Sequence, residues 1–170
     1  ELWLESQVRA HLADVHAALV PGVVYGQVPA FAGGDRGVID LLAVEHTGRL
    51  TVIEVKASED VHLPLQALDY WMRVKVHLER EDFSRLGYFP GVCLTKQWPR
   101  LLLIGPSLDF HPANETVLRY FSPAIPVERI GVAVKWEKEL QVMFRLPGAG
   151  SPEATPCPWQ TTSSKSGRRS

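Results

Sequence analysis

The stretch from Arg36 to Ser58, RGVIDLLAVEHTGRLTVIEVKAS, decides the fold because it reads as two apolar strands joined by a tight turn. Each strand nonetheless carries a carboxylate where a core residue is expected, Asp40 in the first strand and Glu54 in the second. A two-residue turn would place these two carboxylates on opposite faces of the ribbon. A three-residue loop of a type I turn plus a bulge favours glycine at its last, left-handed position, where Gly48 falls. We therefore expect the three-residue loop, which pairs Asp40 with Glu54.

In this register the two carboxylates point to the same face, with Cβ atoms about 4.5 to 5.5 Å apart. Two such charges repel by roughly 3 kcal/mol at an effective dielectric near 20. Lys56 lies on the same face, next along the strand, and offsets part of this repulsion. A divalent cation such as Mg²⁺ offsets more, since it binds carboxylate oxygens. The pattern predicts a metal site in which Lys56, kept protonated by the flanking acids, stabilises negative charge.

An ordinary solvated strand face with a surface ion pair is the alternative reading of Glu54 and Lys56. It is disfavoured because four aliphatic side chains share the face of the two acids in the expected register: Leu42, Val44, Leu50 and Val52. A carboxylate pair in an apolar surrounding needs a partner of opposite charge.

Periodicity along the chain predicts an α/β (α+β) fold, a mixed sheet flanked by helices in the order α-β-β-β-α-β-α-β-β. A first amphipathic helix is expected over residues 2–19, ended by Pro21-Gly22, and a second over 63–80 with Pro64 in its first turn. The remaining expected elements are strands at 23–28, 37–45, 49–57 and 100–105, a helix at 112–121, and a one-sided hairpin over 129–146 that turns at Glu137-Lys138. Residues 86–98 read as a loop or a short strand.

The chain has 170 residues, 45% of them hydrophobic, which is enough for one domain with a substantial core. Residues 1–146 are expected to form this domain, and the Pro-, Ser- and Gly-rich residues 147–170 a flexible tail. The formal net charge is −1, and the tail holds three of the 18 Lys and Arg residues and one of the 19 Asp and Glu residues, which leaves −3 for residues 1–146. A mildly acidic domain argues against DNA binding by charge alone and favours carboxylates matched by metal ions.

The two cysteines, Cys93 and Cys157, lie far apart and suit neither a disulfide framework nor a paired-cysteine zinc site. A reducing, cytoplasmic location is therefore expected. Cys93 lies between Val92 and Leu94 and is expected to be a buried thiol. No stretch approaches the roughly 20 apolar residues of a membrane span, so no membrane partner is expected.

Asp40, thirteen intervening residues and the tripeptide Glu54-Val55-Lys56 lie on a hairpin that follows a helix bearing Glu5. This arrangement resembles the PD-(D/E)XK, or restriction-endonuclease-like, nuclease superfamily. Ile39 stands where the family name has Pro. The second helix carries a further match, because Gln66 and Tyr70 resemble the Gln-x-x-x-Tyr signature of the RecB-like branch and share one helical face.

The resemblance covers about residues 1–105 and implies a role for each matching residue. Asp40, Glu54 and the carbonyl of Val55 would hold Mg²⁺ or Mn²⁺, with Glu5 assisting and Lys56 catalytic. Gln66 and Tyr70 would position nucleic acid or the scissile phosphate. Two structural interpretations are the alternatives. Glu5 could be an acid favoured near a helix N-terminus, and the Gln66–Tyr70 pair could be ordinary helix packing.

The expected function is that of a metal-dependent nuclease that hydrolyses phosphodiester bonds by attack of metal-activated water. The choice of DNA over RNA rests on the resemblance alone, and cleavage of both strands of a duplex would favour a homodimer. The alternative is a catalytically weak or inactive nuclease-fold module that binds DNA or protein within a larger protein. A structural interaction domain is a third, remoter class.

Overall fold

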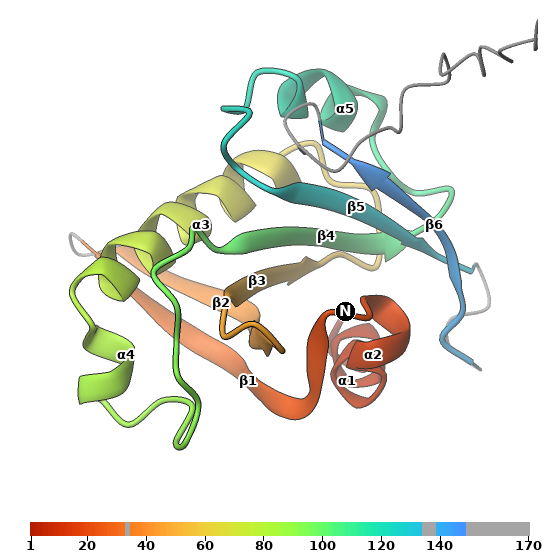
Figure 1. Cartoon of the computed structure of the whole chain (residues 1–170). Helices are drawn as coiled ribbons and strands as arrows, with labels where there is room; N and C mark the ends of the chain where they lie inside the picture. The colour runs from red at the N-terminus through yellow and green to blue at the C-terminus, as the bar shows by residue number, and fades with distance from the viewer. Residues whose placement is uncertain (33–34, 134–138, 149–170) are drawn as a thin grey trace, which may run out of the picture.

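The computed structural model describes residues 1–32, 35–133 and 139–148 (Figure 1). Its centre is one mixed six-stranded sheet in the order β1-β2-β3-β4-β5-β6. The strands are β1 (Leu19–Ala32), β2 (Asp35–Glu45), β3 (Leu50–Val55), β4 (Arg100–Pro106), β5 (Val127–Val132) and β6 (Val142–Pro147). β3, β4 and β5 run parallel, and the other neighbours pair antiparallel. This α/β architecture is consistent with the restriction-endonuclease-like fold expected from the sequence.

Helices cover both faces of the sheet (Figure 1). They are α1 (Leu2–Ala10), α2 (Leu12–Val15), α3 (Leu63–Glu79), α4 (Asp82–Arg85) and α5 (Pro112–Leu118). Among the described residues, no helix combines the length and the apolar character needed to cross a membrane.

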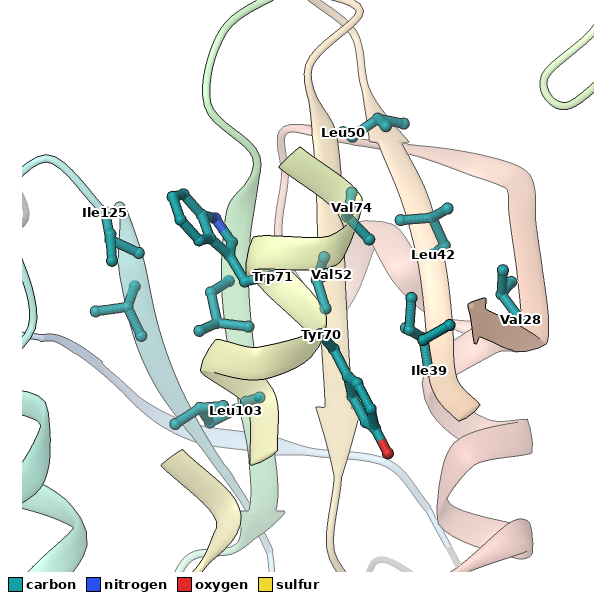
Figure 2. Packing of buried hydrophobic residues seen from close by; sticks show 14 of the residues in the cluster. Val28, Ile39, Leu42, Leu50, Val52, Tyr70, Trp71, Val74, Leu103 and Ile125 are labelled. Carbon is teal, nitrogen blue, oxygen red and sulfur yellow. The ribbon is translucent and has the colours of Figure 1, made fainter. Parts of the chain in front are cut away.

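Helix α3 forms where the sequence predicts it, because its apolar residues recur every three or four positions and Pro64 is accommodated in its first turn. Its buried side chains, including Tyr70, Trp71 and Val74, pack on one face of the sheet against apolar residues of β2 and β3 (Figure 2). These residues are Ile39, Leu42, Val44, Leu50 and Val52. Helices α1 and α2 pack on the opposite face through a second cluster. The strand β4 contributes to both clusters and is buried throughout, as its continuous apolar run predicts.

The loop between β2 and β3 confirms the expected register. The Glu45 amide donates to the carbonyl of Arg49, and the Gly48 amide donates to the carbonyl of Glu45, each at 2.8 Å. Gly48 has φ +82°, the left-handed conformation that the bulged loop requires. The strands then pair Val44 with Leu50 and continue to Leu41 with Ile53. One further step along this register brings the predicted acids opposite each other.

The first helix is shorter than predicted. It breaks at His11, whose φ of −121° and ψ of 37° are not helical, and its continuation α2 ends at Val15. Leu19, which fits the helical stripe, instead pairs with Glu45 at the start of β1, so Pro21 and Gly22 lie within a strand. The pairing energy of the sheet thus overrides the helical periodicity of this segment.

Other differences are local. Residues 86–98 form a loop, and the short helix α4 was not expected. Cys93 is exposed, which corrects the expectation of a buried thiol, because it lies in this loop. The final hairpin is present as β5 and β6, while its predicted turn at 137–138 and tail residues 149–170 lie outside the described residues.

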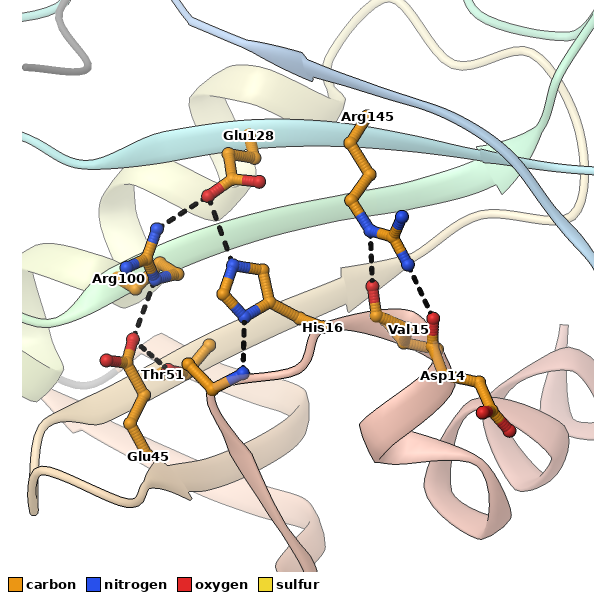
Figure 3. A network of polar contacts seen from close by, with 9 residues as sticks. Asp14, Val15, His16, Glu45, Thr51, Arg100, Glu128 and Arg145 are labelled. Carbon is orange, nitrogen blue, oxygen red and sulfur yellow. Dashed lines mark hydrogen bonds and ion pairs between the residues drawn. The ribbon is translucent and has the colours of Figure 1, made fainter. Parts of the chain in front are cut away.

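A buried polar network lies at the end of the sheet near the β2–β3 loop (Figure 3). The Arg100 guanidinium donates to Glu45 at 2.7 Å and to Glu128 at 2.5 Å, so one cation ties β4 to β2 and β5. His16 lies 3.4 Å from the same Glu128 oxygen. At the other edge, Arg145 on β6 donates to the carbonyls of Asp14 and Val15 and fastens α2 to the sheet. The network fixes the strand order at this end.

Replacing Gly48 with Ala is expected to destabilise the protein by roughly 3 kcal/mol or more, combining the cost of a left-handed alanine with a steric clash. The added Cβ would lie 2.2 Å from the backbone oxygen of Cys93. Gly22 is the matched control, since it has φ +75° but open space around its missing Cβ. Gly22→Ala should cost only about 1 to 2 kcal/mol. Equal losses in chemical denaturation would contradict this account of the loop.

Candidate functional site

The site lies where β2 and β3 separate. Their backbone pairing ends at Leu41 and Ile53, and beyond it the carboxylates take over the hydrogen bonds. The Val55 amide donates to Oδ2 of Asp40 at 2.9 Å, and the Asp40 amide donates weakly to Oε1 of Glu54 at 3.4 Å. The two predicted acids therefore lie together in the open end of the hairpin.

A switch of faces in β1 and β2 shapes this opening. Gln27 in β1 has φ +52°, and it stands across from Asp40 in the register of the two strands. Tyr25 and Val28, on either side of Gln27, both pack in the cluster beneath α3, although an odd spacing should put them on opposite faces. A left-handed residue in the middle of a strand rotates the chain in this way.

The same switch connects the site to α1. The Gln27 amide Nε2 donates to Oε2 of Glu5 at 2.7 Å. The pKa of Glu5 is raised, mainly by burial. The hydrogen bond from Gln27 opposes this shift, and the nearby charge of Asp40 adds to it. The structure thus places Glu5 near Asp40, while Glu5, Asp40 and Glu54 do not come together as one cluster of acids.

Lys56 follows β3 directly, and its amide donates to the carbonyl of Ile104 on β4. Its Nζ donates to Oε1 of Glu1 at 2.9 Å. Burial alone would lower the pKa of Lys56, but the hydrogen bond that Lys56 donates to Glu1 and the charges of Glu1, Asp40 and Glu54 outweigh burial and raise the pKa. Lys56 is therefore an ammonium ion at neutral pH and cannot act as a general base.

The acids themselves bind protons tightly. Burial raises the pKa of Glu54 to about 9, and the neighbouring Asp40 charge adds to the effect. The pKa of Asp40 is raised as well, mainly by burial, while the Val55 amide and Lys56 oppose the shift. In the absence of a cation, Glu54 is therefore protonated at neutral pH, which relieves the repulsion between the two groups.

A cation would fit this opening. Glu54 is fully buried, and its Oε2 has no hydrogen-bond partner among the described residues. An orphaned carboxylate oxygen beside a second carboxylate provides two oxygen ligands, the number that Mg²⁺ commonly takes from a protein before water completes its octahedron. In the described part of the chain, no three His, Cys, Asp or Glu side chains come together as a potential metal cage. Any bound ion would thus depend on Asp40, Glu54, backbone oxygen and water.

Gln66 and Tyr70 lie together on α3, where the Gln66 amide donates to the Tyr70 hydroxyl at 3.3 Å. The Tyr70 ring is 8% exposed and belongs to the core cluster. It extends beside Ile39 and away from Leu50, toward the end of the hairpin that carries the acids (Figure 2). Gly37 makes room for this ring, since a Cβ there would lie 2.5 Å from Cε1 of Tyr70.

Three residues of this region were not found by sequence reasoning: Glu1, Gln27 and Gly37. Glu1 sits outside the predicted motif, and no sequence pattern links it to Lys56. Gln27 carries no signal, because a left-handed glutamine inside a strand cannot be read from periodicity. Gly37 lies in the predicted strand, where an isolated glycine indicates a close approach of another group.

Comparison with known proteins adds little to this picture. No protein-family model matches the chain, and no curated protein matches it. One solved structure, described as an EndoMS-dsDNA2 complex, aligns with 67% of this chain at 17% identity and a TM-score of 0.39. The alignment covers 39% of that chain, so this protein corresponds to well under two thirds of it. A likeness this low carries no argument about function, which has to come from the site itself.

The stability of the metal-free protein should fall as the pH rises from about 5 to 9, by up to roughly 1.4 kcal/mol per pH unit. The folded protein keeps a proton on Glu54, whose pKa is raised to about 9, while the unfolded chain releases it near the ordinary value of 4.5. Glu54→Gln mimics the protonated acid and should remove most of this slope, leaving the smaller contribution of Asp40, whose pKa is also raised. The measurement is chemical denaturation in a chelator across this pH range.

Glu79→Gln is the control for Glu54→Gln, because Glu79 is half-exposed and paired with Lys75 on the surface of α3. This variant should retain the pH slope of the wild type. Parallel curves for the wild type and Glu54→Gln would show that the buried acid is not protonated.

Gly37→Ala should displace the Tyr70 ring and cost about 1 to 3 kcal/mol, as overpacking generally does. In a Tyr70→Ala background, most of this cost should vanish because the ring that the new methyl group meets is gone. A double-mutant cycle measured by denaturation gives the coupling directly. A cost for Gly37→Ala that is the same in both backgrounds would rule out the contact.

Proposed function

We propose that the protein is a metal-dependent nuclease that hydrolyses phosphodiester bonds of DNA by metal-activated water. The observation that carries this proposal is the pair of carboxylates in the open end of the hairpin, with Oε2 of Glu54 buried and lacking a partner in the described part of the chain. A buried acid next to a second, half-buried acid is costly without a cation, and a fold needs no such pair at this position for its stability.

In this proposal Asp40, Glu54 and the Val55 carbonyl would hold Mg²⁺ or Mn²⁺. The ion would supply charge neutralisation and an activated water for attack on a phosphodiester. Metal binding has to displace the proton of Glu54, so the affinity should increase with pH. The Val55 amide holds one oxygen of Asp40 and fixes the orientation of this carboxylate.

Lys56 would stabilise the negative charge that develops on the phosphate, in keeping with its raised pKa. To do so, its ammonium group has to exchange the Glu1 carboxylate for a phosphate oxygen. Glu5, held by Gln27, would assist from α1. Gln66 and Tyr70 would position the nucleic acid from α3, where the Gln66 amide holds the Tyr70 hydroxyl.

A catalytically weak or inactive binding module is the second candidate, and one observation favours it. The ion pair between Lys56 and Glu1 engages the ammonium group that catalysis needs. In such a module the nuclease fold would bind DNA or protein without cleaving the DNA.

The metal site is tested by thermal melting with and without Mg²⁺ or Mn²⁺. Both ions should raise the melting temperature of the wild type at pH 8, because binding stabilises the folded state only. Asp40→Asn should remove this shift. Asp14→Asn is the matched control, because Asp14 is an exposed acid of α2. Absence of any shift for the wild type would refute the nuclease and leave the module.

Cleavage separates the two candidates. A labelled DNA oligonucleotide in Mn²⁺ should be cut by the wild type and not by Asp40→Asn. Lys56→Met should keep the metal-induced shift in melting and lose at least about tenfold in rate, since removing one charge-stabilising group typically costs that much or more. An oligonucleotide that raises the melting temperature but remains intact would identify a binding module.

A further inference from the structure

A second polar site lies away from the hairpin, in a hollow lined by residues of α5, β5 and β6 and of the positions directly after α5 and β6. Figure 1 shows α5 next to these two strands. Its volume is about 190 Å³, and its lining consists of Glu115, Leu118, Arg119, Arg129, Pro147 and Gly148. This volume is below the roughly 300 to 1,000 Å³ of sites that enclose a drug-sized ligand. The hollow therefore suits one small chemical group.

Arg129 is the unusual member of this lining. Its side chain is only 12% exposed, and its Nε is buried without a hydrogen-bond acceptor in the described part of the chain. The ion pair of its Nη2 with Oε2 of Glu115 is long, at 3.7 Å. A guanidinium carries five donors, and burying it with so few acceptors costs free energy. A ligand with several acceptor oxygens would satisfy it.

The charges around the hollow favour an anion. The other Glu115 oxygen, Oε1, accepts a hydrogen bond from Nη2 of Arg119 at 2.5 Å, and this bond is the main reason why the pKa of Glu115 is lowered. Two guanidinium groups thus face one carboxylate, a net charge of +1. Arg119 and Glu115 are each more than half exposed and can rearrange at the rim, while Arg129 is held by the sheet.

We propose that this hollow binds a single phosphate group, with Arg129 as the inner ligand and Arg119 as the ligand at the rim. Guanidinium matches the geometry of phosphate oxygens and binds them in pairs. When no phosphate is present, Glu115 pairs with the two arginines, and it competes with phosphate for them. The proposal does not depend on a metal or on cleavage.

The position of the hollow relates it to the hairpin site. Glu54 pairs with Leu103 in β4, and Leu103 pairs with Arg129 in β5, so the three residues form one row across the sheet. Adjacent strands are about 4.8 Å apart, which puts the Cα atoms of Glu54 and Arg129 roughly 10 Å apart. A phosphate at Arg129 could accordingly come from free phosphate or from a nucleic-acid chain.

Titration with inorganic phosphate at constant ionic strength tests the site. Binding is measured by calorimetry and by the shift in melting temperature, both in the presence of a chelator. The wild type should show saturable binding of one phosphate per chain. Arg129→Met should lose it, and Arg119→Met should weaken it less. Glu115→Gln should tighten it severalfold, since the competing charge is removed. This gain cannot result from misfolding, so it tests the proposal even if Arg129→Met proves unstable.

Asp40→Asn is the control that separates this site from the hairpin, because it should bind inorganic phosphate as the wild type does. A 5′-phosphorylated oligonucleotide that competes with phosphate, compared with its unphosphorylated form, distinguishes a terminal phosphate from the free ion. If both oligonucleotides compete, the hollow binds backbone phosphates. If neither competes, it binds free phosphate. Absence of saturation at tens of millimolar phosphate, or equal affinities of the wild type and Glu115→Gln, would overturn the proposal.

Discussion

The repulsion between two carboxylates in a dry environment is the constraint on which the site depends. The backbone pairing of β2 and β3 stops one step before Asp40 and Glu54, and their side chains then bind the amides of the opposite strand. Removing Glu54 from water raises its pKa to about 9, a cost that the surrounding structure relieves only in part. Lys56 provides one positive charge, but its ammonium group also forms an ion pair with Glu1.

The sequence predicts the centre of this arrangement well because local chemistry specifies it. Gly48 is the residue that a bulged three-residue loop needs, and the loop fixes the register of the paired residues from Val44–Leu50 to Leu41–Ile53. The apolar spacing of α3 and the unbroken apolar run of β4 are equally direct signals, and both elements form as expected. These features need no knowledge of distant residues.

The rest depends on contacts between segments that the sequence does not bring together. Leu19 fits a helix and a strand equally well, and only its partner Glu45 decides between them. Gln27 adopts a left-handed conformation that glutamine does not prefer by itself, and its value lies in the position that it gives Glu5. Arg129 lies in a strand where alternation gives no hint of a half-satisfied guanidinium. Such features appear only when the whole sheet is assembled.

The two ends of the hairpin are held differently, and this difference determines where the sheet can open locally. At the loop end, Arg100 joins three strands through the buried carboxylate of Glu45 and the half-buried carboxylate of Glu128. Separating any of these strands leaves charges that have lost their partners. At the other end, hydrogen bonds from side chains already replace those between the backbones of β2 and β3, so local opening breaks few backbone hydrogen bonds. Motions that admit a ligand can therefore remain confined to one end of the ribbon, while amide protons near the loop exchange only when the domain unfolds as a unit.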